Sequence, residues 1–584
     1  MKVALIGCPF WGTIYGPNYT LGILAALTKR AGHDPVIFDL NIDFYNAVSD
    51  EDKTAYWDYD NHDHKYNKLD ILISKHQDTM DRIAQSILDA DVDLLAFSVT
   101  MFSSYMSIKI NEAIKKRNSD LVTVFGGVDC FEKKMASTYL QNGYIDLVCL
   151  GEAETCFHDL LNSIDSGTWQ KGIKGFLSKA NGDVVDCGEP EVCKDLDLNP
   201  YPDYSGFNLA KYTEMNKYTT QFSRGCVNHC VFCYEHKIHK KYRYRSASDV
   251  AGEITMIMEK TNQDSIFINF ADSMINGSVK ELEKFCDLLI ESDISVSWWG
   301  QAAVRKEMSK ALLAKMKMAG CSGVSWGIET GSDTILKLMR KNTNIDLIKR
   351  VLRDAHDVGI LQNTNFIVGF PGETENEFLE TCNFIIDNIR YLNIVGTTLL
   401  SIQKNAPLYA NFQSYNIQDR DAIIDWETTD GLNNLEQRVQ KEKIIKSLIG
   451  TKYLGSVKTD FDVIDPFLDS LYNRAYGGVM GLLKEAKIKP HDKLLLYGAG
   501  EWGKRFKNIF EANGIPVYAF LDSNSFRWGE EFLGCRVVDP DMILETEPDC
   551  KVVIASSANR VISEKLRRIG FKEDFNYFGL TSIS

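Results

Sequence analysis

Residues 218–236 read YTTQFSRGCVNHCVFCYEH, a predicted β-strand followed at once by three closely spaced cysteines. Cys226, Cys230 and Cys233 have the spacing C-x3-C-x2-C and lie on the loop after the strand. Soft thiolates are preferred ligands of iron–sulfur clusters. Three thiolates bind three irons of a cubane and leave the fourth iron open to another ligand. The sequence therefore predicts a [4Fe–4S] cluster held by these three cysteines.

The alternative ligand set is that of a zinc knot. Zinc usually takes four ligands, and no fourth cysteine lies near these three. His229 and His236 keep zinc open as an interpretation, because imidazole is a common zinc ligand. The remaining 11 of the 14 cysteines are scattered, which is typical of buried apolar residues in a reducing compartment.

Strand and helix candidates alternate over residues 216–400. The strand candidates after the cysteines read SIFINFAD, SVSWWGQ, GVSWGIET, TNFIVGF and VGTTLLSI. At least six such βα units predict a complete or partial α/β barrel. Residues 191–215 carry two prolines and read as a linker, and residues 401–488 as a mostly helical extension.

The chain is long enough for two to four domains, and α/β patterns also flank the centre. Within residues 1–190, the segments VALIGC, DPVIFDL, DLLAFSVT and LVTVFGGV alternate with helical stretches and predict a doubly wound, Rossmann-like parallel sheet. Residues 41–80 are polar and aromatic, and we expect an irregular insertion there. Residues 489–584 form a third, smaller Rossmann-like module.

The cysteine motif resembles the signature of the radical S-adenosylmethionine (SAM) superfamily, including the aromatic Phe232 before the third cysteine. Three further segments follow in the family's order: FINFADSMING (267–277), CSGVSWGIETGS (321–332) and NFIVGFPGET (365–374). The resemblance implies that SAM chelates the open iron and is cleaved reductively to a 5′-deoxyadenosyl radical. It also implies an external electron donor such as flavodoxin or ferredoxin.

The same resemblance implies which residues contact SAM. They are Phe232, Gln301, Arg305, Glu329, Val368 and Gly369. The family's glutamate, here Glu329, reaches the SAM ribose, and a carboxylate can accept hydrogen bonds from both ribose hydroxyls. Arg245 is a further candidate, because a guanidinium can pair with the SAM carboxylate. The alternative for each residue is an ordinary surface or turn role.

The N-terminal domain resembles the cobalamin-binding domain that precedes many radical SAM domains. At the strand ends, Gly126 and Gly127 would let a large ring lie against the sheet. The D-x-H-x-x-G motif of some cobalamin proteins is absent, and the nearest string, at 60–65, lacks the glycine. A fold that has lost cobalamin, or that uses this domain for its substrate, is the alternative.

GAGEWG (498–503) follows a predicted strand and opens a helix, as a dinucleotide fingerprint requires. Asp522 stands where a ribose-binding acid belongs, so residues 498–522 predict an NAD(P) site. The alternative is a nucleotide-free fold for docking or assembly. The module resembles Rossmann-like domains of sugar-modifying enzymes.

The net charge and the hydrophobic pattern disfavour two classes of binding partner, nucleic acids and membranes. A net charge of −15 disfavours broad nucleic-acid binding. The chain shows no apolar run of the length that a membrane span needs and no signal-peptide pattern, so we expect a cytoplasmic protein without membrane attachment.

Two classes of function remain. The first is a radical SAM enzyme acting on a small molecule, with a sugar-related compound as one candidate. Within this class, cobalamin-dependent methyl transfer is expected, and cobalamin-independent cyclisation, rearrangement or oxidation is the alternative. A methylthiotransferase is disfavoured, because the N-terminal domain has no second cysteine triplet. The second class is a non-enzymatic metal- or nucleotide-binding regulator.

Overall fold

The computed structural model describes residues 1–10, 14–57, 69–180, 183–292, 294–449 and, with several gaps, 488–579. The N-terminal part is a sheet in the order β2-β1-β3-β4-β5-β6-β7, parallel except for the last two strands. Its strands are β1 (Lys2–Gly7), β2 (Asp34–Asp39), β3 (Leu94–Ser98), β4 (Val122–Gly126), β5 (Leu147–Cys149), β6 (Phe176–Ala180) and β7 (Asp183–Asp186). The four predicted strands are β1 to β4, which confirms the Rossmann-like sheet.

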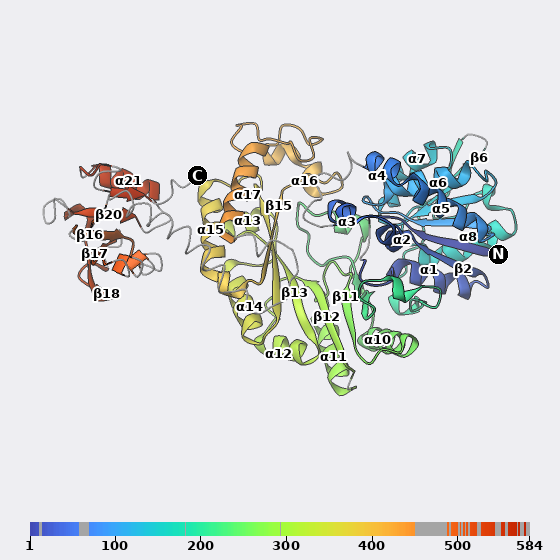
Figure 1. Ribbon diagram of the computed structural model, residues 1–584, viewed down its shortest axis with the longest axis horizontal. Coiled ribbons are helices and arrows are strands. Elements are labelled where there is room, and N and C mark those ends of the chain that lie inside the picture. Colours follow the sequence, from blue (N-terminus) through green and yellow to red (C-terminus); the bar gives the residue numbers. More distant parts are fainter. Residues whose placement is uncertain are drawn as a thin grey trace. The chain divides into compact units, whose positions relative to one another are not determined.

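Helices cover both faces of this sheet (Figure 1). One hydrophobic core includes residues of α1 (Tyr19–Arg30) and α8 (Phe157–Asp165). The opposite core includes residues of α5 (Gln77–Asp89), α6 (Ser104–Lys115) and α7 (Lys133–Gln141). The carboxyl ends of the parallel strands therefore lie between two helical layers, where ligands of open α/β sheets bind.

The expectation of an irregular insertion at 41–80 is wrong for the described residues. They form α2 (Leu40–Ala47), α3 (Asp50–Trp57) and α4 (Leu69–Lys75), followed by the start of α5. The polar side chains are used internally, because buried Asp52 pairs with Lys75 at 2.8 Å and His76 at 2.9 Å. The aromatic Trp57 packs edge-on against Phe10. The string at 60–65 lies outside the described residues.

The central domain is a parallel sheet of six strands in the order β15-β14-β13-β12-β11-β8, which confirms the partial barrel. The strands are β8 (Lys217–Thr220), β11 (Ile266–Phe270), β12 (Val296–Ala302), β13 (Cys321–Glu329), β14 (Leu361–Val368) and β15 (Ile394–Leu399). The helices α10 (Ala247–Thr261), α11 (Val279–Glu291), α12 (Lys310–Met318), α14 (Ile345–Asp357) and α15 (Glu375–Asn388) pack outside it (Figure 1). Buried side chains such as Trp298 face these helices, whereas Gln301 is on the inner face.

Residues 191–215 form an ordered connector that packs against α1. A Cβ at Gly22 of α1 would lie 2.9 Å from Pro202 and 3.0 Å from Tyr204, so only glycine admits the connector there. Lys29 pairs with Asp203 at 2.6 Å. Beyond β15, the described chain forms α16 (Pro407–Ala410), a 3-10 turn and α17 (Leu435–Ile449), joined by irregular segments.

The C-terminal module has its own sheet, in the order β18-β19-β17-β16-β20-β21. The strands are β16 (Leu494–Tyr497), β17 (Val517–Leu521), β18 (Glu531–Phe532), β19 (Cys535–Val538), β20 (Lys551–Ile554) and β21 (Tyr577–Gly579). All neighbouring strands are parallel except β18 with β19. This arrangement confirms the small Rossmann-like module.

Candidate functional site

The three motif cysteines lie on one loop directly after β9 (Ser223–Arg224). Cys230 is buried, and burial raises the pKa of its thiol to about 11. Backbone amides point at the other two sulfurs: Asn228 N–H lies 3.4 Å from Cys226 Sγ, and Glu235 N–H lies 3.5 Å from Cys233 Sγ. Such amide bonds stabilise sulfur ligands of iron. The donor set therefore fits a cluster, whose binding would release the thiol protons.

The zinc alternative finds no support in the described residues. No three His, Cys, Asp or Glu side chains there converge on a position for one metal ion. The rings of His229 and His236 pack against each other, with centroids 5.9 Å apart.

Asp272, which sequence reasoning missed, holds the strand that leads into the cysteine loop. Its fully buried carboxylate accepts hydrogen bonds from Phe222 N–H at 2.9 Å, from Ser223 N–H, and from the Ser223 hydroxyl at 2.6 Å. On the opposite side of the loop, Val231 N–H donates to Met339 O at 3.1 Å. The loop is thus fixed from two sides. The only sequence signal for this role of Asp272 was its position in the FINFADSMING segment.

Glu329 ends β13 and forms an ion pair with Lys341, whose Nζ lies 2.9 Å from Glu329 Oε1. Both side chains are largely buried, 13% and 9% exposed. Although burial alone would lower the pKa of Lys341, the Glu329 carboxylate raises it. A Cβ at Gly327 would lie 2.7 Å from Glu329 Oε1 and 3.1 Å from Lys341 Nζ, so a larger residue there would displace the ends of this pair. Lys341 was not predicted.

The other residues predicted to bind SAM occupy varied positions. Gln301 is exposed at the end of β12. Arg305 donates to the carbonyls of Asn276 and Gly277, both at 2.8 Å, and so braces the loop after β11. Phe232 is partly buried against an apolar cluster, and Val368 is buried at the end of β14.

Two expectations from sequence are met by structural roles instead. Gly369 has φ +79°, and a Cβ there would lie 2.3 Å from Arg438 Cγ, so its glycine makes room for a buried arginine. Arg438 stacks on Trp426 at 3.9 Å. Arg245 is bound by Asp249 at 2.6 Å and Glu253 at 2.7 Å, so its guanidinium is committed to these carboxylates and does not await SAM.

The inner face of the barrel carries neutral polar side chains. Asn363 Nδ2 and Trp299 Nε1 both donate to Ser325 Oγ, at 3.3 and 3.1 Å. The Oδ1 atom of Asn363 is buried and has no hydrogen-bond partner. The exposed side chains of this face are Asn269, Gln301, Asn365 and Thr398. A ligand that donates hydrogen bonds would satisfy these acceptors.

A cavity of about 320 Å³ opens at the strand ends of the N-terminal sheet. Gly126 and Gly127 line it, as predicted, and so do Arg224 and His239 of the central domain. Gly127 has φ +108°, and a Cβ there would lie 2.4 Å from Val99 O, so this position requires glycine. The apolar wall is formed by Ile23, Leu24 and Leu27 of α1, by Phe157 and Leu160 of α8, and by Ala96, Val124 and Phe176 of the sheet.

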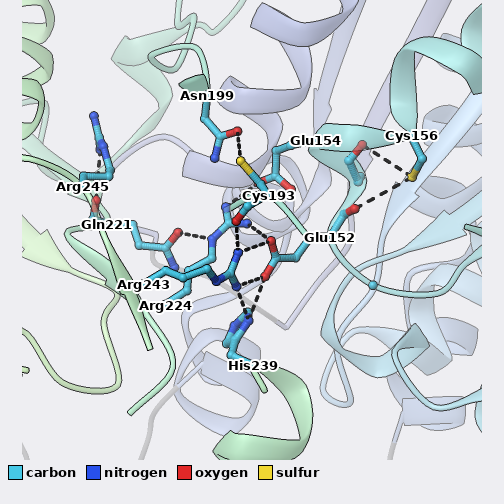
Figure 2. A network of polar contacts seen from close by, with 12 residues as sticks. Glu152, Glu154, Cys156, Cys193, Asn199, Gln221, Arg224, His239, Arg243 and Arg245 are labelled. Carbon is cyan, nitrogen blue, oxygen red and sulfur yellow. Dashed lines mark hydrogen bonds and ion pairs between the residues drawn. The ribbon is translucent and has the colours of Figure 1, made fainter. Parts of the chain in front are cut away.

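A buried ionic network closes the polar end of this cavity (Figure 2). Glu152 and Glu154, from the loop after β5, pair with Arg224. Arg224 stands two residues before Cys226, so the network joins the cavity to the cysteine loop.

Of the glycine turn in the C-terminal module, the structure describes Gly498, Ala499 and Gly503, and residues 500–502 of the predicted NAD(P) site lie outside the described residues. A Cβ at Gly503 would lie 2.1 Å from Gly498 O, so glycine is required there. Asp522, however, turns its carboxylate inward: Ala499 N–H donates to it at 3.1 Å, and Arg527 lies 3.7 Å away.

Comparison with known proteins identifies two segments of the chain. Residues 220–385 match the radical SAM superfamily, and residues 490–575 match a family described as C2185-like, N-terminal. The first match supports the prediction of an enzyme with a cluster and SAM, rather than a regulator. The matches give no support for NAD(P). No helix of the described residues is long and apolar enough to cross a membrane.

Curated relatives match over about half of the chain. The anaerobic magnesium-protoporphyrin IX monomethyl ester cyclase of Rubrivivax gelatinosus is 29% identical over 52% of this chain and 55% of its own. The cytidylyl-2-hydroxyethylphosphonate methyltransferase of Streptomyces wedmorensis is 23% identical over 60% of this chain and 68% of its own. The chain spans between 55% and 66% of the length of three of the curated relatives that it matches.

Solved structures extend the likeness to the N-terminal domain. TsrM of Kitasatospora setae, a radical SAM methyltransferase solved with cobalamin and a [4Fe–4S] cluster, is similar with a TM-score of 0.55, 16% identity and coverage of 70% of this chain and 76% of its own. OxsB, solved with aqua-cobalamin and SAM, is similar with a TM-score of 0.58, 16% identity and coverage of 87% and 70%. Both likenesses concern the fold.

Proposed function

We propose that this chain, a radical SAM enzyme with a cobalamin-binding-like N-terminal domain, transfers a methyl group to an unactivated centre of a small molecule, with cobalamin as methyl carrier. One observation carries the proposal. A single cavity is lined both by the strand-end glycines of the N-terminal sheet and by Arg224, two residues before the first cluster cysteine. A ring bound there would lie beside the radical-forming centre.

The residues of the central domain have separate tasks. Cys226, Cys230 and Cys233 would hold three irons, and SAM on the fourth iron supplies a 5′-deoxyadenosyl radical when an external donor provides an electron. Glu329 would accept hydrogen bonds from the ribose hydroxyls. Lys341 keeps that carboxylate oriented, because the two groups form an ion pair with little water access.

A cavity of about 320 Å³ has the size of a substituent of a large ring, and the ring itself would lie at its mouth. Gly126 and Gly127 leave room at the strand ends, and the apolar wall continues between the sheet and the helices α1 and α8. Burial of apolar surface there would supply most of the binding free energy. Among the residues that line the cavity, His239 is the only histidine, and Glu152 already binds its Nδ1 atom at 3.0 Å.

The substrate we infer is neutral and rich in hydroxyl or amide groups, such as a sugar-related molecule. The exposed side chains named above on the inner face of the barrel are amides and a hydroxyl, without a charge. Asn363 Oδ1 needs a hydrogen-bond donor, and Trp299 supplies an apolar surface beside it.

Cyclisation, with or without cobalamin, is the second candidate. The reaction type is favoured by the relative from Rubrivivax gelatinosus, a cyclase that is 29% identical over 311 residues.

Anaerobic purification in the presence of hydroxocobalamin distinguishes the two functions. We expect about four irons per chain, the visible absorbance of bound cobalamin, and formation of both 5′-deoxyadenosine and S-adenosylhomocysteine from SAM. Formation of 5′-deoxyadenosine alone, by a protein that binds no cobalamin, would contradict methyl transfer and support cyclisation. The variant Cys230→Ala should lose the cluster and both products.

A further inference from the structure

The carboxylate of Glu152 binds two arginines and one histidine at once (Figure 2). Arg224 Nη1 lies 3.0 Å from its Oε2, Arg243 Nη1 lies 2.9 Å from the same atom, and His239 Nδ1 lies 3.0 Å from its Oε1. Burial alone would raise the pKa of Glu152, but the hydrogen bonds from Arg243 and His239 outweigh burial, and the pKa lies well below its usual range.

These partners stand on both sides of the cysteine loop. Arg224 precedes Cys226 by two residues, and His239 follows the short helix α9 (Glu235–Ile238) that comes directly after the loop. Arg243 belongs to β10 (Arg243–Tyr244), which pairs with β9 and places the two arginines opposite each other. One carboxylate of the N-terminal domain therefore ties both ends of the cysteine loop.

Burial makes these contacts specific. The side chain of Glu152 is 8% exposed, that of Arg243 10% and that of Arg224 12%. A buried charge is tolerated only when it is paired with good geometry. Both arginines are therefore held to Glu152, and Arg224 is also held to Glu154. Glu152, Glu154, Arg224 and His239 also line the 320 Å³ cavity. Whatever fills the cavity touches the same groups that fix the loop.

We propose that Glu152 is a positioning residue that couples occupancy of the N-terminal cavity to the geometry of the cysteine loop. The inference rests on the proposed function in one respect, that the occupant is cobalamin. Coupling of this kind is reciprocal: cobalamin changes the affinity for SAM by the same factor by which SAM changes the affinity for cobalamin.

The test compares the full-length wild type with Glu152→Gln, both anaerobically reconstituted. Glutamine keeps the shape and removes the charge that binds the two arginines. The dissociation constant of SAM is measured by equilibrium dialysis with the cluster oxidised, so that SAM is not cleaved, with and without saturating hydroxocobalamin. The EPR spectrum of the dithionite-reduced cluster is recorded in the same pairs of samples.

The chain offers a matched control. Glu189 pairs with Lys240 at 2.7 Å and joins the same two domains, but both side chains are exposed, 59% and 67%, and neither lines the cavity. In the wild type and in Glu189→Gln, we expect cobalamin to change SAM affinity at least about fivefold and to shift the EPR spectrum. In Glu152→Gln, with unchanged iron content, the effect of cobalamin on SAM affinity should fall below about twofold. The cobalamin-dependent shift of the EPR spectrum should disappear.

Wild-type coupling in Glu152→Gln, or no coupling in the wild type despite bound cobalamin, would overturn the inference. If the wild type binds no cobalamin, the proposed function fails, and the positioning role is decided by the cluster alone. An EPR spectrum and reduction potential of Glu152→Gln that equal those of the wild type would then refute it, and altered values would support it. If the glutamine variant loses its iron, Glu152→Asp replaces it, because aspartate keeps the charge but shortens the reach. Reduced coupling in this variant supports the role, and full coupling refutes it.

Discussion

The ammonium of Lys341 lies 2.9 Å from the carboxylate of Glu329, and both groups are more than four-fifths buried at the end of β13. A carboxylate placed for ribose hydroxyls thus has a fixed cationic partner 12 residues further along the chain.

Replacement of Lys341 by Gln should therefore weaken SAM binding about tenfold, the effect of losing one charge-assisted hydrogen bond. Equilibrium dialysis with the oxidised cluster measures this. Lys337→Gln, an exposed lysine on the preceding helix, serves as control and should bind SAM like the wild type. Equal affinities in all three proteins would contradict a role for Lys341.

Adjacent glycines of the N-terminal cavity should respond differently to alanine. At Gly127, a Cβ would meet Val99 O at 2.4 Å with φ +108°, so Gly127→Ala should destabilise the domain by about 2 kcal/mol or more. At Gly126, the nearest atom would be Cys149 Cβ at 3.4 Å. Gly126→Ala should therefore leave the free energy of unfolding within about 0.5 kcal/mol of the wild-type value. Urea unfolding of both variants checks this, and equal midpoints would refute the strand-end geometry.

Asp39 gives stability a specific pH dependence. Burial raises the pKa of its carboxyl to about 6, while the Tyr212 hydroxyl donates to it at 2.8 Å. Because the folded pKa lies above the unfolded value, the folded state holds a proton that the unfolded state has released. This contribution to stability is therefore lost as the pH rises from about 4 through about 6, and it is constant above about 7. Between pH 5 and 7 the free energy of unfolding should fall by about 1 kcal/mol from this group.

Asp39→Asn should remove that component, since asparagine does not titrate. The measurement is the difference in urea midpoint between pH 5 and 7 for the wild type and the variant. An identical difference in both proteins would show that Asp39 does not titrate in this range.

The C-terminal module should not bind NAD(P). The Asp522 carboxylate accepts the Ala499 N–H of the glycine turn, so its task is to shape that turn. Titration of the full-length chain with NADH, followed by nucleotide fluorescence, should give no saturable binding below about 1 mM, the weak end of specific affinity. Saturable binding that is lost in Asp522→Ala would contradict this expectation and support the predicted NAD(P) site.

Local patterns in the sequence predicted much of the fold and the core of the site. Strands such as β1 and β4 are short apolar runs, and the cysteine spacing is complete within eight residues. The long-range partners were not predictable, because their function depends on contacts across the fold. Asp272 binds amides about 50 residues earlier, and Glu152 meets Arg243 across 91 residues.

At two predicted positions the structure shows a role that residue type alone did not indicate. Gly369 has the positive φ expected at a ligand, but the space beside it is filled by Arg438. Arg245 has the charge suited to a carboxylate ligand, but its partners are Asp249 and Glu253 on the helix that follows it. In both cases the pattern predicted a local property correctly and could not predict which neighbour uses it.

The contact of the connector with Gly22 sets where this protein can be recombined with others. Pro202 and Tyr204 fit against a helix that has no side chain at that point, and Tyr212 reaches back to Asp39. Up to residue 212, the connector is thus matched to the N-terminal domain and not to the barrel alone. A chimera that exchanges this domain for a homologous one must carry residues 191–212 with it, and a junction at residue 190 would pair a connector with a foreign helix.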